Sequence, residues 1–176
     1  MTSRVTLSDG VSEMIENIDR DTDRKILSII QEDARTPVAE ISRRTGIEPS
    51  DIRARIEELE RRGVILGYHA RLSPEAVGFG LIAFVFIRTD WHSDVRAVAE
   101  SLARIPEALE VHRIAGEDCY VVKVRAAGVE ELGRLIREKF DCIEAVSSTE
   151  TTVVLKTVKE TASLPLEKPA PLLAIV

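Results

Sequence analysis

The sequence predicts an α+β protein in which a helical domain precedes a domain of alternating strands and helices. In residues 36–68, two short segments with one apolar face each flank Gly46, and Gly63 closes the second. This punctuation is typical of two helices around a tight turn. From residue 81 onward, the apolar periodicity alternates between strand and helix in the order βαββαβ, which is typical of a ferredoxin-like sheet. A chain of 176 residues is long enough to build a core in each of two small domains.

Start and stop signals delimit three helices in the first domain. One is predicted over residues 22–33, and it is expected to pack behind the two helices of the turn. Thr36 is expected to cap the second helix at Pro37, and Gly46 ends it because a residue without a Cβ accepts the left-handed conformation. The third helix begins at Pro49, and its apolar face consists of Ile52, Ile56 and Leu59. Residues 64–72 then have strand character, which predicts either a wing or a connector.

The outer face of the third helix carries small and basic residues. Helical geometry places Ser50 and Ala54 opposite the apolar face, with Arg53 and Arg55 on the flanks. Small residues let the backbone approach DNA bases, and a guanidinium group binds a guanine edge or a phosphate through two N–H groups. This helix is therefore expected to lie in a DNA major groove, with contacts concentrated in its first two turns. The candidate DNA-binding residues are Arg35, Thr36, Arg43, Arg44, Ser50, Asp51, Arg53, Ala54 and Arg55.

Net charge limits how such binding is achieved. The chain carries −6 overall, whereas proteins held on nucleic acid by bulk charge are usually basic. Residues 35–56 contain five arginines and three acidic residues, a local net charge of +2. A patch this modest predicts an oligomer, because two copies double the phosphate contacts. Paired arginines also occur on solvated helix faces. The helix boundaries alone therefore leave two readings equally open, a DNA-binding domain and a helical domain that does not bind DNA.

Six elements are predicted in the second domain. The strands cover residues 81–88, 109–115, 119–126 and 146–155, and the helices cover residues 95–102 and 129–140. The two helices cover one face of the sheet in this arrangement. The other face also needs a cover, and a second copy of the same sheet is the expected one.

Motifs of catalysis and of membrane insertion are missing from the sequence. There is no HExxH, no phosphate-binding glycine loop and no GxSxG, and the three histidines lie far apart. Cys119 and Cys142 lack metal-binding spacing, so neither enzyme activity nor a metal or cofactor is expected. No signal peptide is recognised, and no segment approaches the roughly 20 apolar residues that span a membrane. We therefore expect a cytoplasmic protein that does not contact a membrane.

The turn AGEDCY is the best candidate for binding a small molecule. Gly116 frees backbone N–H groups for a carboxylate, and Asp118 can accept from an ammonium group, which together match the two ends of an amino acid. On pattern alone, a plain hairpin turn is the favoured reading. A redox role for Cys119 is a third option, weakened because no cation adjoins it in sequence.

Several of these motifs together resemble one family. The runs DRDTDRKILSIIQEDARTPVAEISRRTGI, IRARIEELERRGVILGYHARLSPEAVG, GEDCYVVKV and STETTVVLKTVKE occur in the same order as in the Lrp/AsnC (leucine-responsive, feast/famine) transcription regulators, over residues 19–166. The resemblance implies a DNA-binding domain joined to an effector-sensing dimerisation domain. It also implies an effector pocket near Gly116, at the interface between subunits. The candidate effector-binding residues are Gly116, Asp118, Cys119, Tyr120, Thr149 and Thr151.

Two positions depart from the pattern of that family. Glu48 stands where members often carry a serine before the helix-starting proline, and glutamate is a poorer cap. Cys119 stands where many relatives have an aspartate, and Asp118 comes one residue earlier. These departures concern details of DNA and effector contact and leave the expected fold unchanged.

The resulting expectation is a DNA-binding transcription regulator that responds to an amino acid or related metabolite. Its expected organisation is a flexible arm (1–17), a winged-helix-like helix-turn-helix domain (18–66), a connector (67–79), a ferredoxin-like domain (80–159) and a proline-rich tail (160–176). Its expected partners are double-stranded DNA, the effector and the chain itself, as a homodimer with an octamer or another higher oligomer left open. The alternative is a metabolite-binding module that acts on a protein partner instead of DNA.

Overall fold

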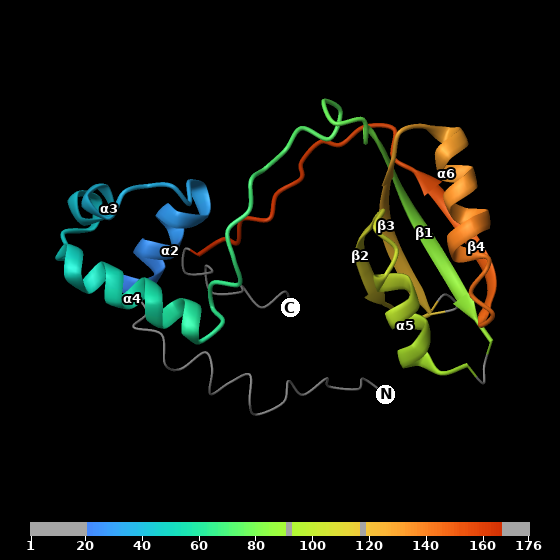
Figure 1. Ribbon diagram of the computed structural model, residues 1–176, viewed down its shortest axis with the longest axis horizontal. Helices are drawn as coiled ribbons and strands as arrows, with labels where there is room; N and C mark the ends of the chain where they lie inside the picture. Colours follow the sequence, from blue (N-terminus) through green and yellow to red (C-terminus); the bar gives the residue numbers. More distant parts are fainter. Residues whose placement is uncertain (1–20, 91–92, 117–118, 167–176) are drawn as a thin grey trace, which may run out of the picture. The chain divides into compact units, whose positions relative to one another are not determined.

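The chain folds into two compact units, which are drawn in Figure 1. The computed structural model describes residues 21–90, 93–116 and 119–166. The helical unit comprises Met1–His69 together with Thr161–Val176, and the sheet unit comprises Ala70–Glu160. The predicted arm at residues 1–17 and the terminal LLAIV lie outside the described residues. Within the described residues, no helix combines the length and apolarity needed to cross a membrane.

The described residues of the helical unit form three helices, as predicted. They are α2 (Thr22–Glu32), α3 (Val38–Thr45) and α4 (Pro49–Arg61). Their shared core consists of Ile26, Ile29, Ile41 and Ile52. Each of these isoleucines comes from the inward face of an amphipathic helix, so burying them holds the three helices together.

The turn between α3 and α4 depends on local hydrogen bonds and one glycine. Gly46 has a φ of 74°, in the left-handed region, and its N–H donates to the Ser42 carbonyl at 2.8 Å. The Ser42 hydroxyl donates to the Ile47 carbonyl at 2.6 Å, and the Thr45 hydroxyl donates to the Ile41 carbonyl at 2.8 Å. These bonds satisfy polar groups that the end of α3 would otherwise leave unpaired.

Two expectations for this unit are corrected. Thr36 does not cap α3, because the helix begins one residue later, at Val38, with Pro37 at the N-cap position and no side-chain capping hydrogen bond. The Thr36 hydroxyl instead donates to the Asp33 carbonyl at 2.8 Å. Asp33 is the C-cap of α2, where an unsatisfied carbonyl is available to accept that bond. Residues 64–72 contain no strand, so the strand character predicted for this segment is wrong.

The sheet unit has the predicted order βαββαβ. Its elements are β1 (Leu81–Thr89), α5 (Val95–Ala103), β2 (Ala108–Arg113), β3 (Tyr120–Ala126), α6 (Val129–Leu135), η1 (Ile136–Phe140) and β4 (Val146–Val153). The strands are arranged β2-β3-β1-β4, and all neighbours are antiparallel. The predicted α+β class and ferredoxin-like arrangement are therefore confirmed.

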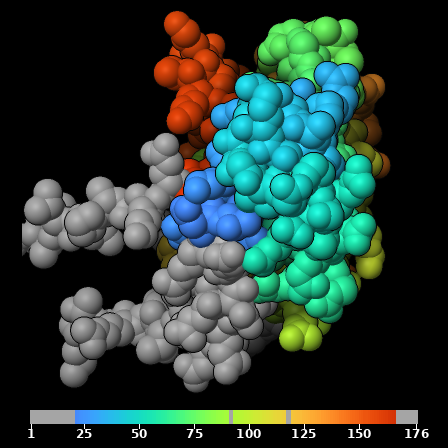
Figure 2. Space-filling model, turned by 90° about the vertical axis from the view of Figure 1, so that its left-hand side faces the viewer, coloured from blue at the N-terminus to red at the C-terminus, as the bar shows by residue number. Residues whose placement is uncertain are grey.

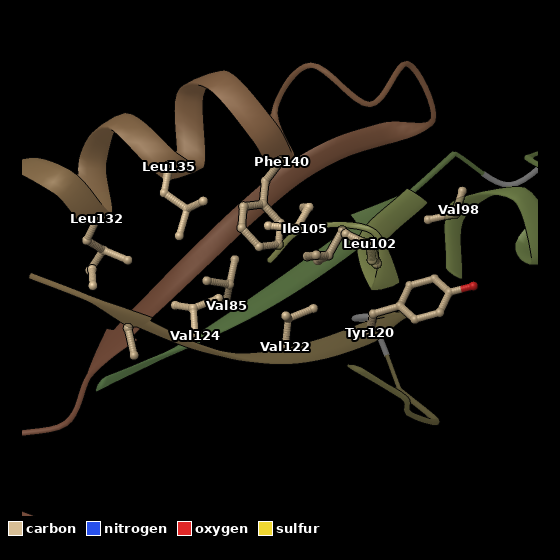
Figure 3. Packing of buried hydrophobic residues seen from close by; sticks show 13 residues of the cluster. Val85, Val98, Leu102, Ile105, Tyr120, Val122, Val124, Leu132, Leu135 and Phe140 are labelled. Atoms are coloured by element: carbon tan, nitrogen blue, oxygen red, sulfur yellow. The ribbon is translucent and has the colours of Figure 1, made fainter. Parts of the chain in front are cut away.

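The core of the sheet unit lies between one face of the sheet and the helices. Figure 3 shows Leu135 and Phe140 pointing from the helical layer toward Val85, Val122 and Val124 of the sheet. Alternate residues of β1 and β3 point to the opposite face because side chains alternate along a strand. That face carries two phenylalanines, Phe84 and Phe86, which are only partly buried in the single chain. It therefore presents apolar area that a single copy leaves uncovered.

A charged cluster lies on this second face and binds the segments that enter and leave the sheet unit. Arg125 Nη2 donates to Glu160 Oε2 at 2.7 Å, and its Nη1 donates to the Phe79 carbonyl at 3.2 Å. Lys123 Nζ contacts Glu160 Oε1 and donates to Glu110 Oε1 at 2.9 Å. Hydrogen bonding to Lys123 lowers the pKa values of Glu110 and Glu160 below 4.5. The segments that enter and leave the sheet unit are thus both bound to Arg125.

We expect the stability of the sheet unit to fall in acid because of this cluster. A carboxylate with a folded-state pKa below its unfolded value stabilises the fold above the unfolded value of about 4.5 and loses that contribution as the pH falls through the folded value. Denaturant unfolding at pH 7 and at stepwise lower pH values would measure the loss. Glu160→Gln should reduce the slope of stability against pH below 4.5, whereas the exposed control Glu100→Gln should not. An identical slope in both variants would contradict this account.

Candidate DNA interface and effector cavity

The predicted reading helix α4 has the expected two faces. Ile52 and Leu59 are buried, whereas Ser50, Arg53 and Ala54 are exposed. Figure 2 shows the surfaces of α3 and α4 next to each other, facing the viewer. Pro49 occupies the first turn, and the Glu48 side chain makes no capping hydrogen bond. Pro49 has no N–H, and the Asp51 N–H donates to the Glu48 carbonyl at 3.0 Å, so the first turn of α4 is closed by its own backbone.

Glu40 partly neutralises the basic residues of α3. Arg43 Nη2 and Arg44 Nε both donate to Glu40 Oε1, at 2.7 and 2.8 Å. These bonds lower the pKa of Glu40 to about 2, so its carboxylate stays ionised near neutral pH. Arg35 is exposed, and its Nε lies 3.7 Å from Asp33 Oδ1. Glu40 is already counted in the net charge of +2 over residues 35–56, and Asp33, which lies just outside that range, adds one further negative charge beside Arg35.

Arg53 and Arg55, which the sequence treats alike, have different surroundings. Arg53 is exposed and has no ion pair within the described ranges of the chain. Arg55 is only partly exposed, and its Nη1 lies 3.6 Å from Oδ1 of the buried Asp23. Asp23 is absent from the sequence prediction. Its place one residue after the start of α2 carries no signal that identifies it as a partner of α4.

A small cavity lies at the predicted effector turn. Its volume is about 210 Å³, and its lining residues are Thr89, Val95, Arg113, Ile114, Ala115, Gly116, Cys119 and Tyr120. The structure thus brings together Gly116, Cys119 and Tyr120 of the predicted set, while Asp118 lies outside the described residues. Sequence reasoning missed Arg113, although a cation three residues before the turn glycine is a possible partner for a carboxylate.

Hydrogen bonds fix the walls of this cavity. The Tyr120 hydroxyl donates to the Val95 carbonyl at 2.7 Å, and burial raises the pKa of this tyrosine. The Thr89 hydroxyl donates to Cys119 Sγ at 3.3 Å, and the Cys119 N–H donates to the Ile87 carbonyl at 2.8 Å. Tyr120 therefore shapes the cavity, with its hydroxyl already committed. The guanidinium of Arg113 is the cationic group of the wall.

Thr149 and Thr151 are not brought to this cavity. They lie on β4, where they pair with Ile87 and Val85, and the Thr149 hydroxyl donates to Asp141 Oδ1 at 3.1 Å. The strand order explains their position, because β4 flanks β1 on the side opposite to β3 and β2. Within one chain, the two threonines and the Gly116 turn are separate.

Comparison with known proteins matches a family model to each of the two units. Residues 19–65 match a family model described as winged helix-turn-helix DNA-binding, and residues 82–164 match one described as Lrp/AsnC ligand binding domain. The HTH-type transcriptional regulator FL11 of Pyrococcus furiosus is 39% identical over 84% of this chain and 96% of its own length. The chain belongs to the Lrp/AsnC family. This member is thus a transcriptional regulator with a helix-turn-helix DNA-binding domain and a ligand-binding domain.

Solved structures of other Lrp/AsnC regulators share the fold. A transcriptional regulator of Neisseria meningitidis, solved as a complex with L-Met, is 32% identical, with a TM-score of 0.79 over 84% of this chain and 96% of that one. The feast or famine regulatory protein Rv3291c of M. tuberculosis, complexed with L-methionine, is 33% identical, with a TM-score of 0.75 over 82% of this chain and 97% of that one. These similarities confirm the fold and the recognition of the family from sequence.

Proposed function

We propose that this regulator binds specific DNA sequences through α4 and that an amino acid or a related metabolite controls its DNA binding or assembly. The observation that carries the proposal is the exposed face of α4. Ser50, Arg53 and Ala54 are exposed there, opposite the buried Ile52. Small side chains admit the helix to a major groove, and Arg53 is free to bind a guanine edge through two N–H groups.

Two copies are proposed to act together, as the modest charge of one copy requires. The apolar Phe84 and Phe86 lie on the sheet face that none of the described helices covers, so a second sheet is the proposed cover. A dimer presents two reading helices to half-sites spaced about one DNA turn apart or a multiple of it. Assembly beyond the dimer is part of the same proposal. A cytoplasmic location is also proposed, because a regulator of this kind acts where its DNA lies.

The cavity at Gly116 is the proposed effector site. Its Arg113 suits a carboxylate, and its Val95 and Ile114 suit a small apolar side chain. A volume of about 210 Å³ limits the ligand to a small metabolite. The two methionine complexes support an amino acid as the chemical class. Neither enzyme activity nor a metal or cofactor is part of the proposal.

DNA selection tests the first half of the proposal. The full chain is incubated with a randomised duplex pool, and the enriched sequences are measured for affinity at several salt concentrations. An enriched palindromic site whose affinity falls steeply with salt is expected. Absence of binding at low salt would contradict DNA recognition and would favour a module that acts on a protein partner.

Thermal unfolding with each of the twenty amino acids tests the second half. A ligand at a hundred times its dissociation constant stabilises the folded state by about 2.7 kcal/mol. Stabilisation by one or a few of them is expected. A uniform lack of effect would count against an amino-acid effector.

Arg113→Met should abolish that stabilisation while leaving the unliganded melting temperature unchanged. Arg113 is exposed, so removing its charge costs little folding free energy, but the carboxylate of the ligand loses its cation. Arg104→Met is the matched control, because Arg104 is exposed, pairs with Glu100 at 3.4 Å and does not line the cavity. Undiminished stabilisation of Arg113→Met by the active amino acid would contradict the proposed role of Arg113.

A further inference from the structure

A carboxylate is buried in the helical unit near its proposed DNA-reading helix. The Asp23 side chain is 2% exposed, and the other buried residues of α2 are the apolar Ile26 and Ile29. Asp23 Oδ1 has no hydrogen-bond partner in the part of the chain that the structure describes. A buried carboxylate is costly unless an opposite charge compensates it, so the identity of that charge determines what Asp23 does.

Arg55 of α4 supplies the opposite charge. Its Nη1 lies 3.6 Å from Asp23 Oδ1, which is within ion-pair distance but longer than a hydrogen bond. The Arg55 side chain is 39% exposed. It lines an open groove of about 500 Å³, together with Thr22, Ile47, Asp51, Ala54 and Glu58. The guanidinium thus reaches from the flank of α4 back to α2.

This position conflicts with a direct role for Arg55 on DNA. If the guanidinium turned outward to a phosphate, it would leave Asp23 buried without its cation. Arg53 has no such constraint, because it is exposed and has no ion pair in the described residues. The two arginines of α4 that flank its small residues are therefore suited to different tasks.

We propose that Asp23 is a positioning residue that retains Arg55 on the protein side of α4. The pair sets α4 against α2 and withholds one cation from the DNA backbone, so sequence-specific binding depends on Arg53. This inference rests on the proposed function of α4 as the reading helix. It predicts that removing the Asp23 charge increases indiscriminate DNA binding, which loss of packing alone would not do.

The test uses the full chain, a duplex that it enriches from a randomised pool and a scrambled duplex of equal composition. Binding is measured against salt for Asp23→Asn, Arg55→Met, the double variant and Arg53→Ala. Asp23→Asn should tighten binding to the scrambled duplex, steepen its salt slope by about 0.9 for each copy bound and lower the specificity ratio about tenfold. Arg55→Met should lower the melting temperature, and the double variant should restore both the melting temperature and the specificity ratio.

Three outcomes would overturn the inference. Shallower salt slopes in both Arg55→Met and the double variant would show that Arg55 contacts phosphate directly. An unchanged slope and specificity ratio in Asp23→Asn would show that Asp23 does not restrain Arg55. Failure of the unaltered chain to enrich any duplex, or to bind DNA at low salt, would instead overturn the proposed function and this inference with it.

Discussion

Replacing Phe140 by alanine should destabilise the sheet unit by about 3–5 kcal/mol, because the change leaves a large cavity that the surrounding core fills only in part. Phe140 ends η1 and is 0% exposed. Its ring contributes to the same core as Leu135 and Val122, as Figure 3 shows. The loss approaches the whole stability of a small domain. Denaturant unfolding, with hydrogen exchange of the β1 and β3 amides to locate the effect, would measure it.

Val129→Ala is the control for that experiment. Val129 begins α6 and is 66% exposed, so its truncation removes little buried area, and alanine has the higher helix propensity. Its stability should stay within about 0.5 kcal/mol of the unaltered chain. A comparable small change for Phe140→Ala would contradict the packing of η1 on the sheet.

Arg53→Ala should weaken binding to the selected DNA site by about 1–3 kcal/mol and relax the preference at one base position. A guanidinium that pairs with a guanine edge contributes discrimination, and alanine cannot replace its two N–H donors. The melting temperature of the protein should not change, because Arg53 is exposed and has no ion pair within residues 21–90, 93–116 and 119–166. Fluorescence anisotropy with the selected site and with single-base variants of it would measure both effects.

Arg61→Ala provides the matched control on the same helix. Arg61 is exposed in the last turn of α4 and donates to Glu58 Oε1 at 2.7 Å, away from the first two turns. Its loss should change the DNA affinity by less than about 0.5 kcal/mol. Equal affinities of Arg53→Ala and the unaltered chain would remove Arg53 as the reader.

Features that depend on neighbouring residues were predictable from sequence. Gly46 and Pro49 delimit α3 and α4 because their backbone conformations are restricted by local chemistry. The order of strands and helices in the sheet unit likewise follows from periodicity alone. The error at Thr36 has a different origin. α3 starts one residue later than predicted, so Pro37 and not Thr36 stands at its N-cap position, and the Thr36 hydroxyl donates to the carbonyl at the end of α2.

The candidate sites were predictable only in part, because each combines residues from distant positions. The cavity at Gly116 was located from its turn, but Thr89 and Val95 reach it from other elements. Thr149 and Thr151 lie on β4 and do not line the cavity within one chain. Their proposed place in an effector pocket rests on the resemblance to the family and on a second subunit.

The sequence by itself determined the fold class and the helix that is proposed to read DNA, and its ordered motifs resemble the Lrp/AsnC family. The fold class and the helix follow from periodicity and from glycine and proline positions, and the family follows from the resemblance. Only the tertiary structure distinguished Arg53 from Arg55, because their difference comes from Asp23, which lies on another helix and is buried. The charge of a side chain is known from sequence, but its partner is decided by folding, since folding brings groups distant in sequence into a low-dielectric interior.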